Sequence, residues 1–197
     1  MRKRKSTEAN RERIILAAAK LIREQGIDNT TLADIATAAD ISKGTLYYYY
    51  ASKGDLIFDI AERHMNNMTE RIFRWLSRSS SAQNPRTVFR MVMDTVMRSR
   101  NRGHIHVYLI KEALTESPHL QKRFVEEYAR WRTMIQEGLQ KVYGSSDGYD
   151  TMSRVLLATI DGLVLQRLLG VRDLAVDDIA AFLEASGSAI VSSVGTA

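Results

Sequence analysis

Apolar residues recur at helical spacing through most of the chain. The first such stripe places four apolar side chains on one face of a helix: Ile14, Ala18, Leu21 and Ile22. This helix is expected to begin near Thr7 and to stop at Gly26, because glycine suits the position that follows a helix. The sequence therefore opens with an amphipathic helix.

Two shorter helices follow. Thr30 or Thr31 can cap a helix over about 32–39, and Ser42 can cap another over 43–49. The residues between them, 40–42, have the composition of a turn. Two short helices joined by such a turn predict a helix-turn-helix motif.

Longer helices are expected over the rest of the chain. Their expected ranges are 53–76, 85–102, 104–115, 118–144, 149–169 and a last helix capped by Asp177. The loops between them are expected at 77–85 and 144–148, where serine, glycine and proline gather. The helix at 149–169 is apolar almost all round, so it must be covered on both sides. The pattern predicts an all-α protein of about nine helices.

Composition agrees with this fold class and excludes several others. The 197 residues are 45% hydrophobic and 26% charged, and only 11 are glycine and 2 proline. With no cysteine, a disulfide scaffold, a thiolate zinc site and a cysteine nucleophile are excluded. The longest apolar stretch, 155–165, is broken by Asp161 and is shorter than the roughly 20 residues that span a bilayer. Without an apolar leader segment, we expect a cytoplasmic protein.

Charge is concentrated at the N-terminal end. Residues 1–53 hold ten Lys or Arg and six Asp or Glu, whereas the other 144 residues hold 18 and 17. A basic head on a nearly neutral body favours a polyanionic partner, although a solvated basic tail would give the same charge. The cluster from Arg2 to Lys5 fits either a disordered arm in a DNA minor groove or a solubilising end.

Motifs of catalysis and metal binding are absent from the sequence. There is no Gly-rich phosphate loop, no His-Glu-x-x-His and no Gly-x-Ser-x-Gly. His104 and His106 would point about 200° apart on a helix, which argues against a shared metal ion. We therefore predict no enzyme, no catalytic residue, no metal and no cofactor.

The segment 31–56, TLADIATAADISKGTLYYYYASKGDL, resembles the DNA-binding signature of the tetracycline-repressor (TetR) family. The resemblance rests on matches at fixed offsets: Gly26, Thr31, Ile35, Ala36, Ala39, Ser42, Gly44, Thr45, Leu46, Tyr47, Tyr49, Tyr50, Ser52, Lys53 and Leu56. Three positions depart from the family pattern. Asp40 stands where Gly is usual, Tyr50 where Phe is commonest and Gly54 where Glu is usual.

The resemblance implies a homodimeric transcriptional regulator, most often a repressor. Residues 1–53 would be the DNA-binding domain and 54–197 the ligand-binding and dimerisation domain. A small hydrophobic effector would release the dimer from a palindromic operator. The alternative is a ligand-insensitive DNA-binding protein, which would need a basic surface throughout.

Candidate DNA contacts come from the motif and its flanks. Lys43 can reach a guanine edge, the outward tyrosines can meet phosphates or bases, and Lys53 can meet a phosphate at a helix start. Tyr50 is instead expected to pin the third helix to the fourth. The predicted DNA-binding set is Thr31, Ser42, Lys43, Gly44, Thr45, Tyr47, Tyr48, Tyr49 and Lys53.

Two further sets are expected in the C-terminal part. Methionines, aromatic rings and a few polar groups at helical spacing predict an effector pocket for a neutral or weakly polar compound, although each could be an ordinary core residue. That set is Met68, Phe73, Met91, Thr95, His106, Ile110, Phe124, Tyr128, Trp131 and Thr159. The last two helices are expected to form a dimer interface through Leu156, Leu163, Ile179, Leu183, Ser186, Gly187 and Ile190.

Overall fold

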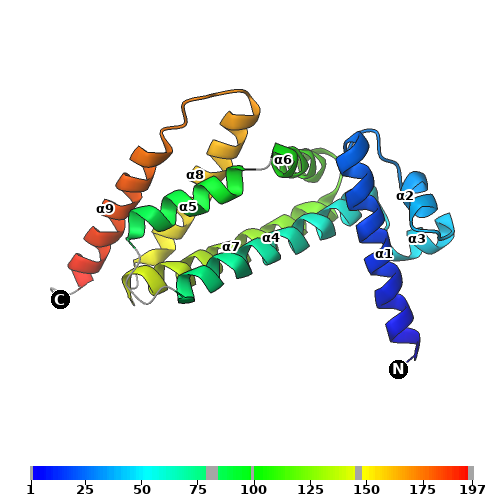
Figure 1. Ribbon diagram of the computed structural model, residues 1–197, viewed down its shortest axis with the longest axis horizontal. Helices are drawn as coiled ribbons and strands as arrows, with labels where there is room; N and C mark the ends of the chain where they lie inside the picture. The colour runs from blue at the N-terminus through cyan, green and yellow to red at the C-terminus, as the bar shows by residue number, and fades with distance from the viewer. Residues whose placement is uncertain (1, 79–83, 99, 145–147, 195–197) are drawn as a thin grey trace. The chain divides into compact units, whose positions relative to one another are not determined.

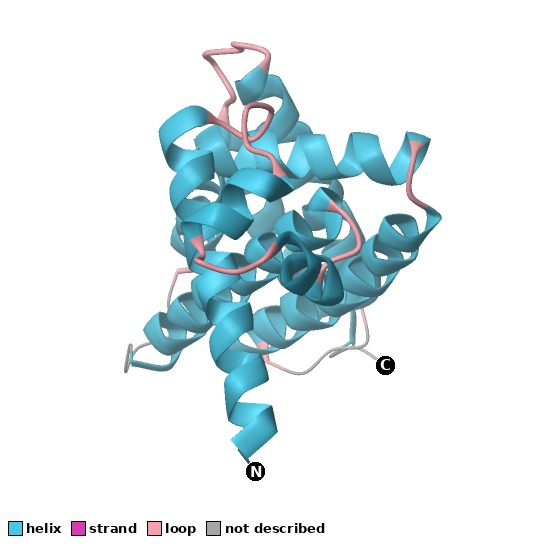
Figure 2. Cartoon of the chain, turned by 90° about the vertical axis from the view of Figure 1, so that its right-hand side faces the viewer, coloured by secondary structure: helices cyan, strands magenta, loops and turns pink. Residues whose placement is uncertain are grey.

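The computed structural model describes residues 2–78, 84–98, 100–144 and 148–194, and in these ranges the chain forms helices and connecting loops alone (Figures 1 and 2). The helices are α1 (Arg2–Gln25), α2 (Leu32–Ala38), α3 (Lys43–Tyr49), α4 (Lys53–Arg78), α5 (Pro85–Met97), α6 (Arg100–Thr115), α7 (Pro118–Tyr143), α8 (Tyr149–Leu168) and α9 (Val176–Val194). The prediction of an all-α fold is confirmed.

Local sequence chemistry sets the ends of the early helices. Gly26 takes a left-handed backbone with φ of 84° and closes α1, as expected. Thr31 caps α2 in a capping box with Asp34, and Ser42 caps α3 by accepting the amide of Thr45. The helix-turn-helix motif therefore begins and ends where its capping residues predict.

Three boundaries differ from the expectation. α1 begins at Arg2, so the backbone of the basic cluster is helical and not a disordered arm; the side chains of residues 2–6 lie outside the description. α5 ends at Met97, and Gly103 lies inside α6 and not after a helix. Gly103 lies close to α8, since a Cβ at this position would be 3.2 Å from both methyl groups of Leu168.

α9 begins at Val176, one residue before its expected cap. Asp177 lies in the first turn of α9 and not before it. Its Oδ1 forms an ion pair with Nη1 of Arg90 at 2.8 Å. The predicted loops fall largely on residues 79–83 and 145–147, which lie outside the described residues.

The chain forms two compact units. Unit 1 comprises residues 1–66 with 105–121, and unit 2 comprises 67–104 with 122–197. The division differs from the predicted domain boundary after residue 53, because unit 1 also contains the first half of α4 and most of α6. Three helices, α4, α6 and α7, thus begin in one unit and end in the other.

The core of unit 1 holds the helix-turn-helix motif on α1. The buried residues come from four successive helices or their ends and are Ile14, Ala18, Ile35, Ala36, Ala39, Leu46, Tyr50 and Leu56. The same apolar positions supply the periodicity in the sequence. The core fixes the angle between α2 and α3, and it leaves the outer face of α3 to solvent.

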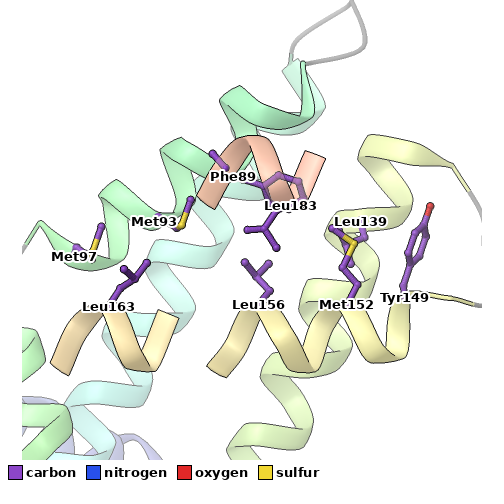
Figure 3. Close-up of a cluster of buried hydrophobic side chains, with 10 residues drawn as sticks. Phe89, Met93, Met97, Leu139, Tyr149, Met152, Leu156, Leu163 and Leu183 are labelled. Carbon is purple, nitrogen blue, oxygen red and sulfur yellow. The ribbon is translucent and has the colours of Figure 1, made fainter. Parts of the chain in front are cut away.

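The core of unit 2 is formed where α5, α8 and α9 meet (Figure 3). Phe89, Met93 and Met97 form one face of α5 at a spacing of four residues, and they pack against Leu156 of α8 and Leu183 of α9. The described helices include none that is long and apolar enough to cross a membrane.

Candidate functional site

The start of α3 is fixed by a small set of hydroxyl contacts. Ser42 Oγ accepts the amide of Thr45 at 3.0 Å and lies 2.8 Å from Thr45 Oγ1. Both hydroxyls are therefore engaged in the cap. Within the predicted DNA-binding set, Ser42 and Thr45 orient α3, and their side chains are not fully free for a ligand.

The outer face of α3 presents a lysine, a glycine and two phenol rings to solvent. Lys43 and Gly44 are exposed in the first turn, and Tyr47 and Tyr48 keep 56% and 78% of their surface. Tyr49 is half-buried against the unit 1 core and meets Tyr48 edge-on, with ring centroids 5.3 Å apart. Large aromatic side chains so exposed on a short helix are typical of a recognition surface.

Thr31 is the N-cap residue of α2, the first helix of the helix-turn-helix motif. Its amide donates to Asp34 Oδ2 at 2.9 Å and its hydroxyl to the same oxygen at 2.7 Å. These hydrogen bonds hold the pKa of Asp34 below its usual range. Thr31 is exposed, so its backbone and methyl group remain accessible beside the exposed turn of α3.

A buried polar group fixes the end of α3. The Tyr50 hydroxyl donates to Asp59 Oδ2 at 3.0 Å, and Arg11 donates to the same carboxylate oxygen at 2.5 Å. Tyr50 is only 4% exposed, and burial raises its pKa to about 12. The expected role of Tyr50, pinning α3 to α4, is confirmed. Asp59 and Arg11 were not in the predicted set, since they lie 9 and 39 residues from Tyr50.

The turn between α2 and α3 adopts the backbone that the family pattern implies. Asp40 has a φ of 52°, in the left-handed region where glycine is favoured. Arg13 Nη2 donates to the carbonyls of Ala39 and Asp40 at 2.6 and 3.2 Å. The turn is thus held to α1 mainly through backbone oxygens.

Lys53 lies in the first turn of α4, and its side chain contacts two other segments of unit 1. Its Nζ donates to the carbonyl of Ile27 at 2.7 Å and lies 5.5 Å from the ring centroid of Tyr108. The side chain is half-buried and already engaged within unit 1. Its amine has a structural task that the sequence motif does not reveal.

The predicted effector residues divide between the two units. His106 and Ile110 belong to unit 1, and the other eight belong to unit 2. Within unit 2, Phe124, Tyr128 and Trp131 form a row on α7, with ring centroids 6.3 and 5.1 Å apart along the row. Tyr128 donates to Asp161 Oδ2 of α8 at 2.6 Å.

Other members of that set are engaged locally. Thr95 Oγ1 donates to Met91 Sδ at 3.7 Å, and Thr159 Oγ1 donates to the carbonyl of Val155 in its own helix at 2.8 Å. The Thr159 hydroxyl therefore does not need a ligand to supply a hydrogen-bond partner. Met68 is buried, and Phe73 is half-buried below Lys141, whose Nζ lies 5.9 Å from the ring centroid.

The predicted dimer residues lie mostly inside unit 2. Leu156, Leu163 and Leu183 are buried in its core, at 4%, 4% and 2% exposure, and Ile179 and Ile190 pack against that core. Gly187 is buried, and its Cβ would lie 2.5 Å from the ring of Tyr143. Ser186 is half-buried and donates to the carbonyl of Phe182. These residues therefore build the helix packing of a single chain.

A different face of α8 and α9 is exposed. On α8 the stripe of apolar or small residues repeats at intervals of three and four: Val155, Ala158, Gly162, Leu165 and Leu169. On α9 the exposed residues Phe182, Ala185 and Ala189 repeat at the same helical spacing. Phe182 keeps 67% of its surface and Leu165 keeps 49%, so this face has no cover in the chain as described.

Two family models match the chain. Residues 14–60 match the bacterial regulatory proteins of the tetR family, and residues 82–191 match the C-terminal part of BetI-type transcriptional repressors. The chain belongs to the TetR family of transcriptional regulators. It is thus a DNA-binding regulator with a helix-turn-helix domain, as the sequence resemblance implies.

Relatives with curated descriptions match the N-terminal part. The HTH-type regulator YvdT of Bacillus subtilis is 37% identical over 68 residues, 34% of this chain and 35% of YvdT. The regulator HbdR of Aromatoleum is 44% identical over 54 residues, 27% of this chain and 24% of HbdR. The chain spans about a third or less of the length of these relatives, and the similarity centres on the DNA-binding helices.

Solved structures match over most of the chain. The repressor FadR of Thermus thermophilus, in complex with lauroyl-CoA, has a TM-score of 0.68 and 26% identity over 90% of this chain and 94% of FadR. A regulator from Saccharomonospora viridis in complex with choline has a TM-score of 0.64 and 24% identity over 89% and 94%. Among the described residues, no group of His, Cys, Asp and Glu is arranged to hold a metal ion.

Proposed function

We propose that the protein is a cytoplasmic homodimeric repressor that binds a palindromic operator and is released by a small effector. The observation that carries the proposal is the outer face of α3, where Lys43, Tyr47 and Tyr48 are exposed on a helix pinned from behind by Tyr50. A short helix held at a fixed angle with its polar and aromatic face outward fits the major groove.

Each exposed group has a chemistry that suits DNA. The Lys43 ammonium can donate to the O6 and N7 of guanine, and the phenol hydroxyls of Tyr47 and Tyr48 can donate to phosphate oxygens. Gly44 is exposed and has no side chain, so the DNA can approach the backbone of α3 closely there. In a two-fold dimer the two α3 helices would read half-sites about 34–36 Å apart.

The dimer is proposed to form through the exposed stripe on α8 and α9. Small residues in its centre, Ala158 and Gly162 on α8, allow close helix approach, and a Cβ at Gly162 would meet nothing within 4 Å. The large side chains Leu165 and Phe182 would be covered by the second copy. Two helices from each chain would make a four-helix bundle.

The effector is proposed to meet the aromatic row on α7. Tyr128 and Trp131 offer ring surface, and Asp161 places a carboxylate against the Tyr128 hydroxyl. A carboxylate beside aromatic rings favours a neutral or cationic hydrophobic compound over an anionic one. Lauroyl-CoA in FadR and choline in the S. viridis regulator show that related folds take ligands of opposite charge.

Operator binding is tested by selecting sites from random duplex DNA with the purified protein. A palindromic consensus and its retardation in a gel shift are expected. Uniform binding to every sequence would favour the alternative, a ligand-insensitive DNA-binding protein, and absence of DNA binding would contradict the proposal.

Effector class is tested by fluorescence in a Trp75→Phe background, which leaves Trp131 as the single indole of the chain. Choline, a tetraalkylammonium ion with longer chains, a neutral hydrophobic compound and lauroyl-CoA serve as probes. Quenching by the cationic or neutral probes, with release of operator and a loss of cation response in Asp161→Asn, is expected. A response to lauroyl-CoA alone would overturn the class but retain the mechanism.

A further inference from the structure

α7 carries a glutamate among its buried residues. Glu127 is only 4% exposed, whereas the other two glutamates of this helix, Glu126 and Glu137, are exposed. Glu127 follows Phe124 by three residues and precedes Trp131 by four. Residues at these spacings share one side of a helix, so Glu127 lies on the same side of α7 as two rings of the aromatic row.

The printed ion pair of Glu127 joins a buried carboxylate to an exposed guanidinium. Arg130 Nη1 lies 2.9 Å from Glu127 Oε1, and the two side chains keep 55% and 5% of their surface. The carboxylate is thus withdrawn from water, while more than half of the arginine side chain is still in contact with it. Arg130 can therefore leave the pair and return to water, but the Glu127 carboxylate cannot do so while α7 keeps its place.

Stability alone gives no reason for a glutamate at this position. A carboxylate loses its hydration on burial, and a buried ion pair usually stabilises a fold no more than apolar residues of the same volume. A buried carboxylate beside aromatic rings is instead suited to an organic cation. The faces of the rings attract the positive charge, and the carboxylate neutralises it.

A second carboxylate lies at the same aromatic row. Tyr128 follows Glu127 in the chain and donates to Asp161 Oδ2 of α8 at 2.6 Å. Burial, the hydrogen bond to Asp161 and the charge of this carboxylate raise the pKa of Tyr128, so the phenol stays a neutral donor. The Tyr128 ring lies between those of Phe124 and Trp131 along the row. Ring surface and two carboxylates are thus joined to residues 124–131 of α7.

We propose that Glu127 is the counter-ion of a cationic effector and that Arg130 occupies this position in the unliganded protein. An organic cation that binds at the aromatic row displaces Arg130 from the Glu127 carboxylate, and Arg130 turns out to water. The buried carboxylate is neutralised in both states by this exchange. The inference rests on the proposed function, because it names the ligand class and a charged residue of the effector site on α7.

Two variants in the Trp75→Phe background separate the roles of the two charges. Glu127→Gln removes the negative charge and keeps the size of the side chain, whereas Arg130→Met removes the internal cation and keeps the apolar stem. The probes are tetraethylammonium and octanol, an uncharged compound with the same number of carbon atoms. Titrations followed by the fluorescence of Trp131 give the affinity of each variant for each probe.

The expected affinities for tetraethylammonium change in opposite directions. Glu127→Gln should bind it at least about tenfold more weakly, because the buried counter-ion is lost. Arg130→Met should bind it at least about tenfold more tightly, because the ligand no longer displaces an internal cation. Both variants should bind octanol about as the wild type does, since this probe makes no use of the charge.

The matched control is an ion pair with the same separation on the surface of α8. Arg154 Nε lies 2.9 Å from Asp150 Oδ2, but these side chains keep 60% and 53% of their surface. Arg154→Met should leave both affinities unchanged. Thermal unfolding provides a second measurement: Arg130→Met should melt below the wild type without ligand, and tetraethylammonium should raise its melting temperature by more. A purely structural pair would lower the melting temperature without changing the response to tetraethylammonium.

The outcomes separate this inference from the proposed function. A wild type whose Trp131 responds to neither probe contradicts the proposed effector site itself. A wild type that responds to octanol alone, or a Glu127→Gln protein that binds tetraethylammonium like the wild type, overturns the inference alone. An Arg130→Met protein with unchanged or lower affinity for tetraethylammonium overturns the displacement of Arg130. Should Arg130→Met fail to fold, Glu127→Gln decides the question, because its amide oxygen can still accept from Arg130.

Discussion

Asp40 carries the left-handed backbone of the turn in the helix-turn-helix motif. Its side chain is fully exposed, and its ion pair with Arg13 Nη2 is long, at 3.4 Å. This contact therefore offsets little of the strain of a φ of 52°. We expect Asp40→Gly to leave the free energy of unfolding unchanged or to raise it by up to about 1 kcal/mol, because relief of the backbone is partly offset by a freer unfolded chain.

The matched variant for this turn is Asp40→Ala. Alanine has the Cβ that disfavours a positive φ and lacks the short polar side chain that tolerates it, so the variant should be less stable than the wild type. Urea denaturation of the three proteins gives the order. A less stable Asp40→Gly protein would show that the carboxylate contact with Arg13 outweighs the strain.

Tyr50 is the C-cap residue of α3, and its hydroxyl lies in the unit 1 core. Tyr50→Phe keeps the ring in the core but removes the hydrogen bonds with Asp59 and Arg11. The free energy of unfolding should fall by about 0.5–1.5 kcal/mol, the usual net value of a hydrogen bond. Thermal unfolding measures it, and Tyr48→Phe, at a ring that is 78% exposed, should change nothing.

Single residues were predictable where their partners are close in the sequence. Thr31, Ser42 and Gly26 act on amides or carbonyls three or four residues away, and the sequence places them correctly. The contact of Arg11 with Asp59 spans 48 residues, and that of Lys53 with Ile27 spans 26. No local pattern records such pairs, and the phosphate contact predicted for Lys53 stays a prediction.

At the scale of the element, α3 is expected to read sequence through its first turn. Lys43→Ala should weaken operator binding by about 1–3 kcal/mol and relax the preference at one base position of each half-site, as a base-edge contact does. Competition gel shifts with operators changed at single positions measure the preference. If the affinity falls equally for every duplex, Lys43 contacts a phosphate instead.

Helices were predictable as elements, but several of their boundaries were not. Ridges of apolar residues in α5 and α7 repeat at helical spacing, and Pro85 and Pro118 mark their first positions as expected. In the sequence, Gly103 resembles the glycine that ends a helix. In the structure it lies inside α6, where the absence of a side chain allows Leu168 of α8 to approach. The sequence alone does not distinguish a glycine that ends a helix from a glycine that allows a neighbouring helix to pack closely.

For the whole molecule, the apolar pattern of the sequence does not predict which residues are available for a dimer interface. α8 is apolar on several faces, so periodicity cannot tell which face belongs to the chain's own core. The structure assigns Leu156 and Leu163 to that core and leaves Val155 and Leu165 exposed. A charged residue at Leu183 would therefore unfold unit 2 and would not test dimerisation.

The exposed stripe gives the sharper test of assembly. Leu165→Glu combined with Phe182→Glu should convert the dimer to a folded monomer, because both side chains are exposed in the single chain and would face a second copy in the bundle. Analytical ultracentrifugation measures the mass, and circular dichroism shows whether the helices remain.

The control is Val125→Glu on α7, at a valine that is 67% exposed and outside the stripe. Since one head can meet only one half-site, the monomer should also bind the palindrome far more weakly. A variant that stays dimeric would place the interface on another face, and a control that dissociates would place it on α7.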